Sequence, residues 1–184
     1  MHGEWARIQG ATRRVVDGAG RVASGIGNAT SYLVGVRYLT EANTTYIAEY
    51  YRNGTGYTAA ESRDFYRYVG EAFATLAATG DASAVQKAIA LGQAGYGRPN
   101  PGSQYLYLRA QQKDALDIVY FQPAVTAMVN LDDRSYQVTP ELLYTGFNNV
   151  ELRARLYLLN GSRDTDFGAK QNSRKFEFQA RLYF

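Results

Sequence analysis

The strict alternation of apolar and polar residues over 174–184, at the end of the chain, is the feature that most constrains the fold. Successive side chains of a β-strand point to opposite faces of a sheet, so a period of two predicts a strand with one apolar and one polar face. The same period recurs over 150–158 and 136–145, which predicts neighbouring strands. The apolar positions of the last segment are Phe176, Phe178, Ala180, Leu182 and Phe184.

The upstream sequence extends this pattern to eight predicted strands. Further strands are expected over 119–130, 105–111, 45–50, 32–38 and, less clearly marked, 3–9. Short turns are expected at 41–43, 113–115 and 146–148, and long connections at 11–29, 54–102 and 160–173, with 132–134 as a short member of the second set. Such alternation of connection lengths is typical of an antiparallel up-and-down transmembrane β-barrel, whose long loops lie outside the cell.

Hydropathy alone does not reveal a membrane protein, because mean hydropathy is −0.36 and no apolar run is long enough for a membrane helix. In a membrane barrel only alternate residues face lipid. A soluble ligand-binding barrel shows the same alternation with its apolar face inward. The tyrosines favour the membrane, because they bracket the apolar stretches about 20–26 Å apart, near the height of an aromatic girdle. The girdle residues are Tyr32, Tyr38, Tyr136 and Tyr144.

The opposite faces of the predicted strands carry ten charged residues. An Arg or Lys on the lipid face costs about 2–4 kcal/mol at the bilayer midplane, so these residues are expected to line a polar lumen. They form either a cross-strand ion-pair network that plugs a narrow barrel or a wetted pore wall with slight anion preference, to which Arg153 and Arg155 contribute most. The predicted pore-lining residues are Arg37, Glu49, Arg109, Glu141, Glu151, Arg153, Arg155, Lys175, Glu177 and Arg181.

Residues 58–92 differ from the rest in period and predict a helical insert in a long extracellular loop. Thr58 and Glu61 have capping-box spacing, apolar residues follow at helical intervals, and Gly80 is a stop signal. A second helix is expected over 81–91. The insert is expected to pack on itself as a cap, with folding into the lumen or binding of a partner as the alternative.

Catalysis and cofactor binding find little support in the sequence. The only histidine is His2, there are no cysteines, and the net charge of +3 is scattered, so we expect no enzyme, no cofactor and no nucleic-acid partner. A histidine-free enzyme using Glu49, Glu141 or Glu151 is the remaining catalytic alternative. Loop aspartates at 132, 133, 164 and 166 are expected to be solvated rather than to bind calcium, and no metal site is predicted.

Three stretches carry a resemblance to a known family. The runs YLVGVRYLTEANTTYIAEYYRNGTGY at 32–57 and VNLDDRSYQVTP at 129–140, with the alternating end, resemble proteobacterial outer-membrane β-barrel and porin-like proteins over about the last 155 residues. The resemblance implies location in the bacterial outer membrane, contact with lipid and lipopolysaccharide, and insertion by the barrel-assembly machinery. The residues that match the assembly signal are Phe176, Phe178, Ala180, Leu182 and Phe184.

No signal peptide precedes the first predicted strand, so the sequence is expected to be a processed chain or, preferably, a fragment. Residues 1–184 then form one barrel domain or the C-terminal half of a larger barrel. The predicted function is a porin-like channel or export conduit for small polar or anionic solutes. A homo-oligomer is compatible with this function. The alternative is a closed structural or adhesion barrel that acts through its extracellular loops.

Overall fold

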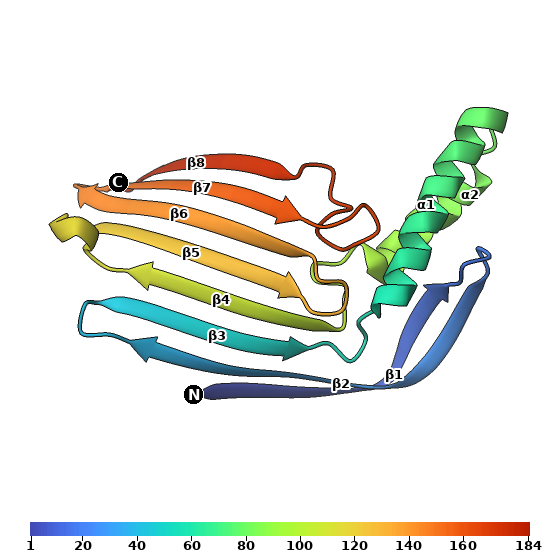
Figure 1. The fold of residues 1–184 in the computed structure, drawn as a ribbon, viewed down its shortest axis with the longest axis horizontal. Helices are drawn as coiled ribbons and strands as arrows, with labels where there is room; N and C mark the ends of the chain where they lie inside the picture. Colours follow the sequence, from blue (N-terminus) through green and yellow to red (C-terminus); the bar gives the residue numbers. More distant parts are fainter.

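The computed structural model describes residues 1–184 and contains one eight-stranded antiparallel sheet in the order β1 to β8 (Figure 1). The strands are β1 (His2–Val16), β2 (Val22–Leu39), β3 (Thr44–Arg52), β4 (Gln104–Gln112), β5 (Phe121–Asn130), β6 (Tyr136–Phe147), β7 (Val150–Asn160) and β8 (Arg174–Leu182). Every strand pairs with its neighbours in the chain, so the predicted all-β up-and-down topology is confirmed.

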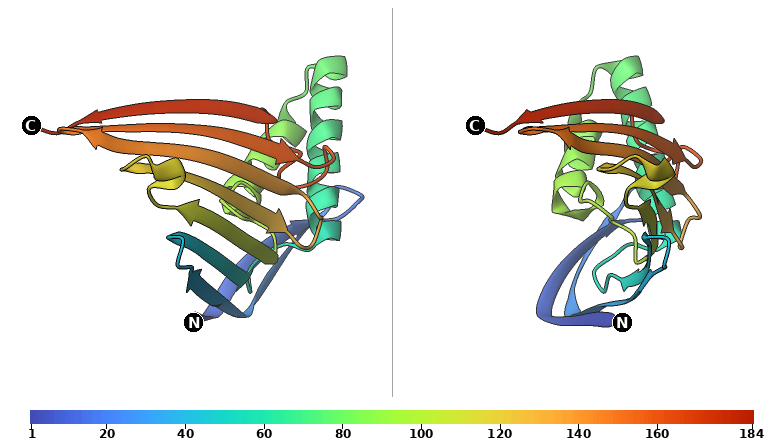
Figure 2. Two further views of the ribbon diagram at one scale, coloured as in Figure 1. Left: turned by 60° about the vertical axis from the view of Figure 1, so that its left-hand side comes forward. Right: turned by 90° about the vertical axis from the view of Figure 1, so that its left-hand side faces the viewer.

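The sheet is not closed into a barrel, because β1 and β8 do not pair. Of the two predicted arrangements of residues 1–184, one closed eight-stranded barrel is therefore contradicted, and the part of a larger barrel stays a prediction. The sheet curves into an open arc whose concave side carries helix α2 (Ser83–Leu91) (Figure 2). An eight-stranded barrel has room inside only for its own side chains or one small ligand. Here the concave side also contains the end of the insert, where Pro99 and Asn100 share a hollow with Glu49 and Tyr107 of the sheet.

The first hairpin is longer than the sequence predicted, and the expected loop over 11–29 is wrong. Strand β1 continues to Val16, and only residues 17–21 form the turn, in which the Asp17 carboxylate accepts hydrogen bonds from Ala19 N and Arg21 N. The period of two was hidden because residues 23–29 of β2 are mostly glycine, alanine and serine, with Ile26 as the only large apolar side chain. Gly10, at a φ of 68°, lies in the bulge that bends β1 between Ile8 and Ala11.

The other connections agree with the predicted pattern except between β4 and β5. Residues 113–120 connect these strands through the 3-10 turn η2 (Ala115–Asp117), so the turn is longer than predicted and Val119 precedes β5. The loops of β1–β2, β3–β4, β5–β6 and β7–β8 share one end of the sheet, and both termini lie at the other (Figure 1). We call these the insert end and the terminal end.

The register gives the sheet two chemically different faces. Cross-strand partners have side chains on the same face, and the pairs Glu141–Arg155 and Arg155–Glu177 belong to the polar face. The pair Leu156–Phe176 belongs to the apolar face. The polar face is the concave inner one, which carries the insert, and the apolar face is the convex outer one (Figure 2).

The predicted helical insert is confirmed. Helix α1 (Ala59–Thr79) begins at the Thr58–Glu61 capping box and ends at Gly80, whose φ of 75° favours glycine. Helix α2 begins at Ser83 rather than at 81, and it continues into a π-helical turn, η1 (Gly92–Tyr96). The Asp81 carboxylate accepts hydrogen bonds from Ser83 N and Oγ, which fixes the turn between the helices. No helix is both long and apolar enough to span a bilayer.

The main buried core joins the insert to the first hairpin. Val16 packs with Phe65 of α1 and Leu91 of α2, and the Tyr96 ring stacks between Tyr57 and Phe65 at centroid distances of 3.7 and 4.0 Å. The insert therefore packs on β1 as well as on itself. The prediction that the insert packs on itself as a cap is therefore incomplete.

The Arg13–Glu61 ion pair is a second link between β1 and α1, and it makes the insert sensitive to acid. Burial raises the pKa of Glu61, but hydrogen bonds from Thr58 N and the Arg13 guanidinium outweigh burial and lower the pKa below its ordinary value of 4.5. A lowered pKa in the folded state stabilises the fold fully above the unfolded value, and this contribution is lost as pH falls through the lowered pKa.

We therefore predict that amide protection in the first turn of α1 decreases on acidification below about pH 4.5. Glu61→Gln should have weaker protection at neutral pH and no such acid-induced loss. Glu71→Gln, an exposed carboxylate of the same helix without an ion pair, is the matched control and should keep the wild-type response. Hydrogen exchange measures this, and an unchanged acid response in Glu61→Gln would contradict the assignment.

Candidate functional site

The Glu141 carboxylate of β6 is the centre of the charged inner face. Its Oε1 accepts a hydrogen bond of 3.0 Å from Arg109 of β4, and its Oε2 accepts one from Arg155 of β7. Arg153 of β7 lies 4.0 Å from the same carboxylate. Glu141 is only 8% exposed, so a single nearly buried carboxylate orients three guanidinium groups from two strands.

Two branches extend the network to the β8 edge. In the first, Arg155 donates to Glu177 at 3.2 Å, and Glu177 accepts from Lys175 at 2.9 Å. In the second, Glu151 accepts from Arg153 at 3.1 Å and lies 3.7 Å from Arg181. Eight of the ten predicted pore-lining residues thus form one continuous ion-pair network.

Neutral polar side chains extend the network towards β5. Arg109 donates to Thr126 Oγ1 at 2.9 Å and to Gln111 Oε1 at 3.0 Å, and Gln111 donates to Gln122 Oε1 at 3.0 Å. Because the arginines of the centre remain about one-quarter exposed, they keep contact with water. The face is therefore polar and wetted, and its charges are mostly paired.

The remaining two predicted residues lie apart from the network, on β2 and β3. Glu49 forms a 3.0 Å hydrogen bond with the His2 imidazole across Gly35, where a Cβ atom would lie 2.5 Å from the His2 ring. Arg37 is exposed and has no ion-pair partner. Glycine at position 35 is thus required by the close approach of two neighbouring side chains.

The outer face presents the predicted apolar positions to the surroundings. Val125 near its middle is 44% exposed, and Phe176, Phe178 and Leu182 of β8 are each more than 60% exposed. The predicted assembly-signal residues therefore share this apolar face at the β8 edge, while Phe184 extends beyond the strand.

Aromatic residues lie at both ends of the outer face. Near the insert end, Tyr32 packs at 6.0 Å from Tyr50, and Tyr136 begins β6. At the terminal end, Tyr38 pairs with Tyr46 across β2 and β3. Tyr144 completes this row, with its ring 5.2 Å from that of Phe147. The four predicted girdle tyrosines thus lie on one face in two rows, with aliphatic residues between them.

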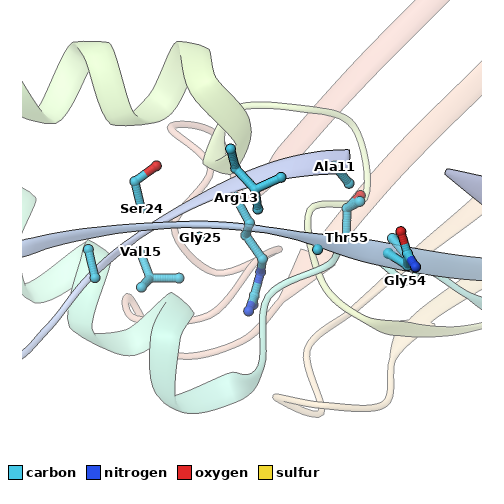
Figure 3. A pocket seen from close by; sticks show the side chains of 12 residues that line it. Ala11, Arg13, Val15, Ser24, Gly25, Gly54 and Thr55 are labelled. Atoms are coloured by element: carbon cyan, nitrogen blue, oxygen red, sulfur yellow. The ribbon is translucent and has the colours of Figure 1, made fainter. Parts of the chain in front are cut away.

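A hollow of about 400 Å³ lies on the inner side of the first hairpin (Figure 3). Its walls are mostly small residues such as Ala11, Ser24 and Gly25, and Gly54 and Thr55 line one end of it. The Arg13 guanidinium beside it is occupied by Gly56 O and Glu61. The hollow is separate from the ion-pair network and has no cluster of chemically reactive side chains.

The loop aspartates hold the insert end together. Asp132 accepts hydrogen bonds from Ser103 N and Gln104 N, and Asp166 accepts one of 2.7 Å from the Tyr105 hydroxyl. These aspartates are therefore hydrogen-bonded to other residues of the protein. The prediction that they are simply solvated is wrong. No group of three or more acidic, histidine or cysteine side chains is placed to hold a metal ion.

Comparison of the chain with models of protein families, with curated proteins and with solved structures found no significant match. The resemblance to outer-membrane barrels therefore stays a prediction from the sequence.

The sequence did not indicate three features of the site. Each of them joins residues at least 11 positions apart in the sequence. They are the Glu49–His2 hydrogen bond, the Arg13–Glu61 ion pair and the Gln111–Gln122 hydrogen bond. Face parity would have placed Gln111 and Gln122 on the charged side, but only the register brings them together. Arg13 lay within a predicted loop, so its place on the inner face was hidden by the missed hairpin.

We predict that Glu141→Ala destabilises the sheet more than any other removal of an inner-face carboxylate. Because three arginines lose their shared partner, we expect the free energy of unfolding to fall by about 2 kcal/mol. This value lies between those for exposed and buried ion pairs. Glu41→Ala, in an exposed turn, is the control and should change stability by less than about 0.5 kcal/mol. Urea unfolding of the refolded chain measures both, and equal midpoints would contradict the central role of Glu141.

Proposed function

We propose that this chain forms the wall of an outer-membrane channel, with the charged inner face along the path of small polar or anionic solutes. The observation that carries the proposal is the reversed distribution of polarity: charged residues converge on the concave side, and apolar residues are exposed on the convex side. A water-filled interior and a lipid-facing exterior require this arrangement in a membrane barrel.

The continuity of the apolar face supports lipid as its surroundings. A water-soluble monomer rarely exposes a contiguous apolar patch larger than a few hundred Å². Here the exposed apolar side chains extend across β2 to β8 and include Val34, Leu108, Val125, Leu142 and Phe178. The two aromatic rows at the ends of this face agree with the girdles of membrane barrels.

The charges of the inner face favour a polar solute that itself carries a slight negative charge. It carries six cationic and four anionic side chains among the predicted pore-lining residues. Carboxylates hold Arg153 and Arg155, whereas Arg37 has no ionic partner. Arg37 is therefore a stronger candidate for direct solute contact than the two arginines that the sequence favoured.

The ion-pair network favours a second candidate function, a non-conducting structural or adhesion barrel. Charges that are paired with each other in the wall do not offer free sites to a solute. The loops and helices at the insert end would then be the functional surface. Conductance separates the two candidates.

The lipid-facing assignment predicts different effects for one substitution on the two faces of β5. Val125→Lys places an ammonium group on the apolar face and should weaken bilayer insertion by about 2–4 kcal/mol. Met128→Lys places the same group on the inner face, in the hollow that Glu49 also lines, and should be tolerated. Folding titrations into lipid vesicles measure both variants, and equal losses would contradict the assignment of faces.

The channel assignment predicts steady current with anion preference in a planar bilayer. Arg37→Gln should lower the ratio of anion to cation permeability towards one, because it removes the unpaired cation of the inner face. Arg37→Lys keeps the charge and is the control. A protein that is inserted and folded but carries no current would contradict the channel and leave the structural barrel.

A further inference from the structure

A small polar pocket lies between the first hairpin and the insert, apart from the ion-pair network of the inner face. Its volume is about 40 Å³, and it borders the hollow of Figure 3, with which it shares Arg13 and Thr55. One water molecule needs about 10–15 Å³ of such volume, so the pocket has room for a group of about three non-hydrogen atoms. The polar side chains that line it include Thr12, Arg13, Asn53, Tyr57, Arg98 and Asn100.

The walls of this pocket carry cationic hydrogen-bond donors and no carboxylate. Arg98 lines the pocket, is exposed and takes part in no ion pair. The Nη2 atom of Arg13 donates to Gly56 O and to Glu61, but its Nε is buried without a hydrogen-bond partner. A buried donor without an acceptor is unfavourable. The walls are therefore suited to a group that accepts hydrogen bonds.

Neutral donors complete the walls. The side-chain oxygen of Asn53 accepts hydrogen bonds from Thr55 N and Oγ1, which leaves the Asn53 amide nitrogen free. The Tyr57 hydroxyl lies against Gly95, where a Cβ atom would overlap it, and it bonds to no other group of the protein. Burial raises the pKa of this hydroxyl more than the two neighbouring arginine charges lower it. The hydroxyl is therefore protonated at neutral pH and can donate.

Backbone hydrogen bonds fix the segments that form the walls. Tyr57 N donates to Pro101 O at 2.8 Å, which joins the connection before α1 to the segment after η1. Arg98 N donates to Gly95 O at 3.2 Å, so the Arg98 side chain extends from a hydrogen-bonded turn. Because the walls are ordered by the fold itself, little further ordering is needed when a ligand binds.

We propose that this pocket binds the carboxylate group of a small organic anion. A guanidinium group matches the planar carboxylate geometry, and the neutral donors can share the same two oxygens. The local charge favours an anion, because Arg13 and Arg98 have only the Glu61 carboxylate between them, and Glu61 does not line the pocket.

Size favours a carboxylate over larger oxyanions. A carboxylate has three non-hydrogen atoms, as many as the pocket admits, whereas phosphate has five. The bordering hollow of about 400 Å³ has room for the rest of an organic solute. The proposal goes beyond the channel, because the pocket is formed by the insert and the first hairpin whether or not the sheet conducts.

Titration with sodium acetate tests the proposal on the ¹⁵N-labelled chain, refolded in detergent micelles, with ionic strength held constant by sodium chloride. We expect saturable shifts of the Gly95 and Arg98 signals in NMR spectra. Acetamide, a neutral molecule of similar size, should give no saturable shift. Shifts that do not saturate with acetate, or that acetamide reproduces, would overturn the proposal if the chain keeps its folded spectrum.

Substitutions of Arg98, followed at the Gly95 signal, identify the group that binds acetate. Arg98→Gln should weaken binding by about tenfold or more, because a charge-assisted hydrogen bond is lost, and Arg98→Lys should weaken it less. Arg63→Gln removes an exposed arginine of α1 outside the pocket and should bind acetate like the wild type. Equal affinities of Arg98→Gln and the wild type would overturn the site.

Inorganic phosphate tests the choice of ligand class. Phosphate that binds more tightly than acetate at the same ionic strength would overturn the carboxylate assignment in favour of a tetrahedral oxyanion. These titrations need neither insertion into a bilayer nor current, so their failure is distinguishable from failure of the channel proposal.

Discussion

The separation of charge from apolar surface, imposed by the period-two geometry of the strands, is the constraint on which the rest of the structure depends. A charged side chain is costly in an apolar medium unless it is paired and wetted. Here the alternation places every member of the Glu141 network on one face, where three arginines share a carboxylate. The outer face is thereby left free of charge between its aromatic rows, and this difference between the faces is the physical basis of the proposed channel wall.

The insert end depends on a different set of interactions. Stacking of Tyr96 between Tyr57 and Phe65 and the Arg13–Glu61 pair hold the helices to the first hairpin. The buried Tyr105 and Asp166 join the remaining loops. The helices therefore lie at one mouth of the sheet, beside the inner face, and do not cover the apolar face.

Strand order, face assignment and the helical insert could be predicted from the sequence because they depend on local periodicity and capping. The strand with Phe176 and Phe178 shows this, as does the capping box at Thr58. The first hairpin was missed because glycine and other small residues weaken the apolar signal on which periodicity depends. Whether the sheet closes, and which distant side chains pair, such as His2 with Glu49, could not be predicted from the sequence. Both depend on curvature and register, which arise from the whole sheet.

The position of Trp5, the only tryptophan, gives the most direct test that the outer face contacts lipid. Its indole is 68% exposed on that face, next to Tyr32 in the neighbouring strand. The measurement is quenching of its fluorescence in vesicles of brominated lipid, compared with quenching by aqueous acrylamide. We expect blue-shifted emission that brominated chains quench strongly and acrylamide quenches weakly. Water-like emission that only acrylamide quenches, from a folded and vesicle-bound chain, would contradict the lipid-facing outer face.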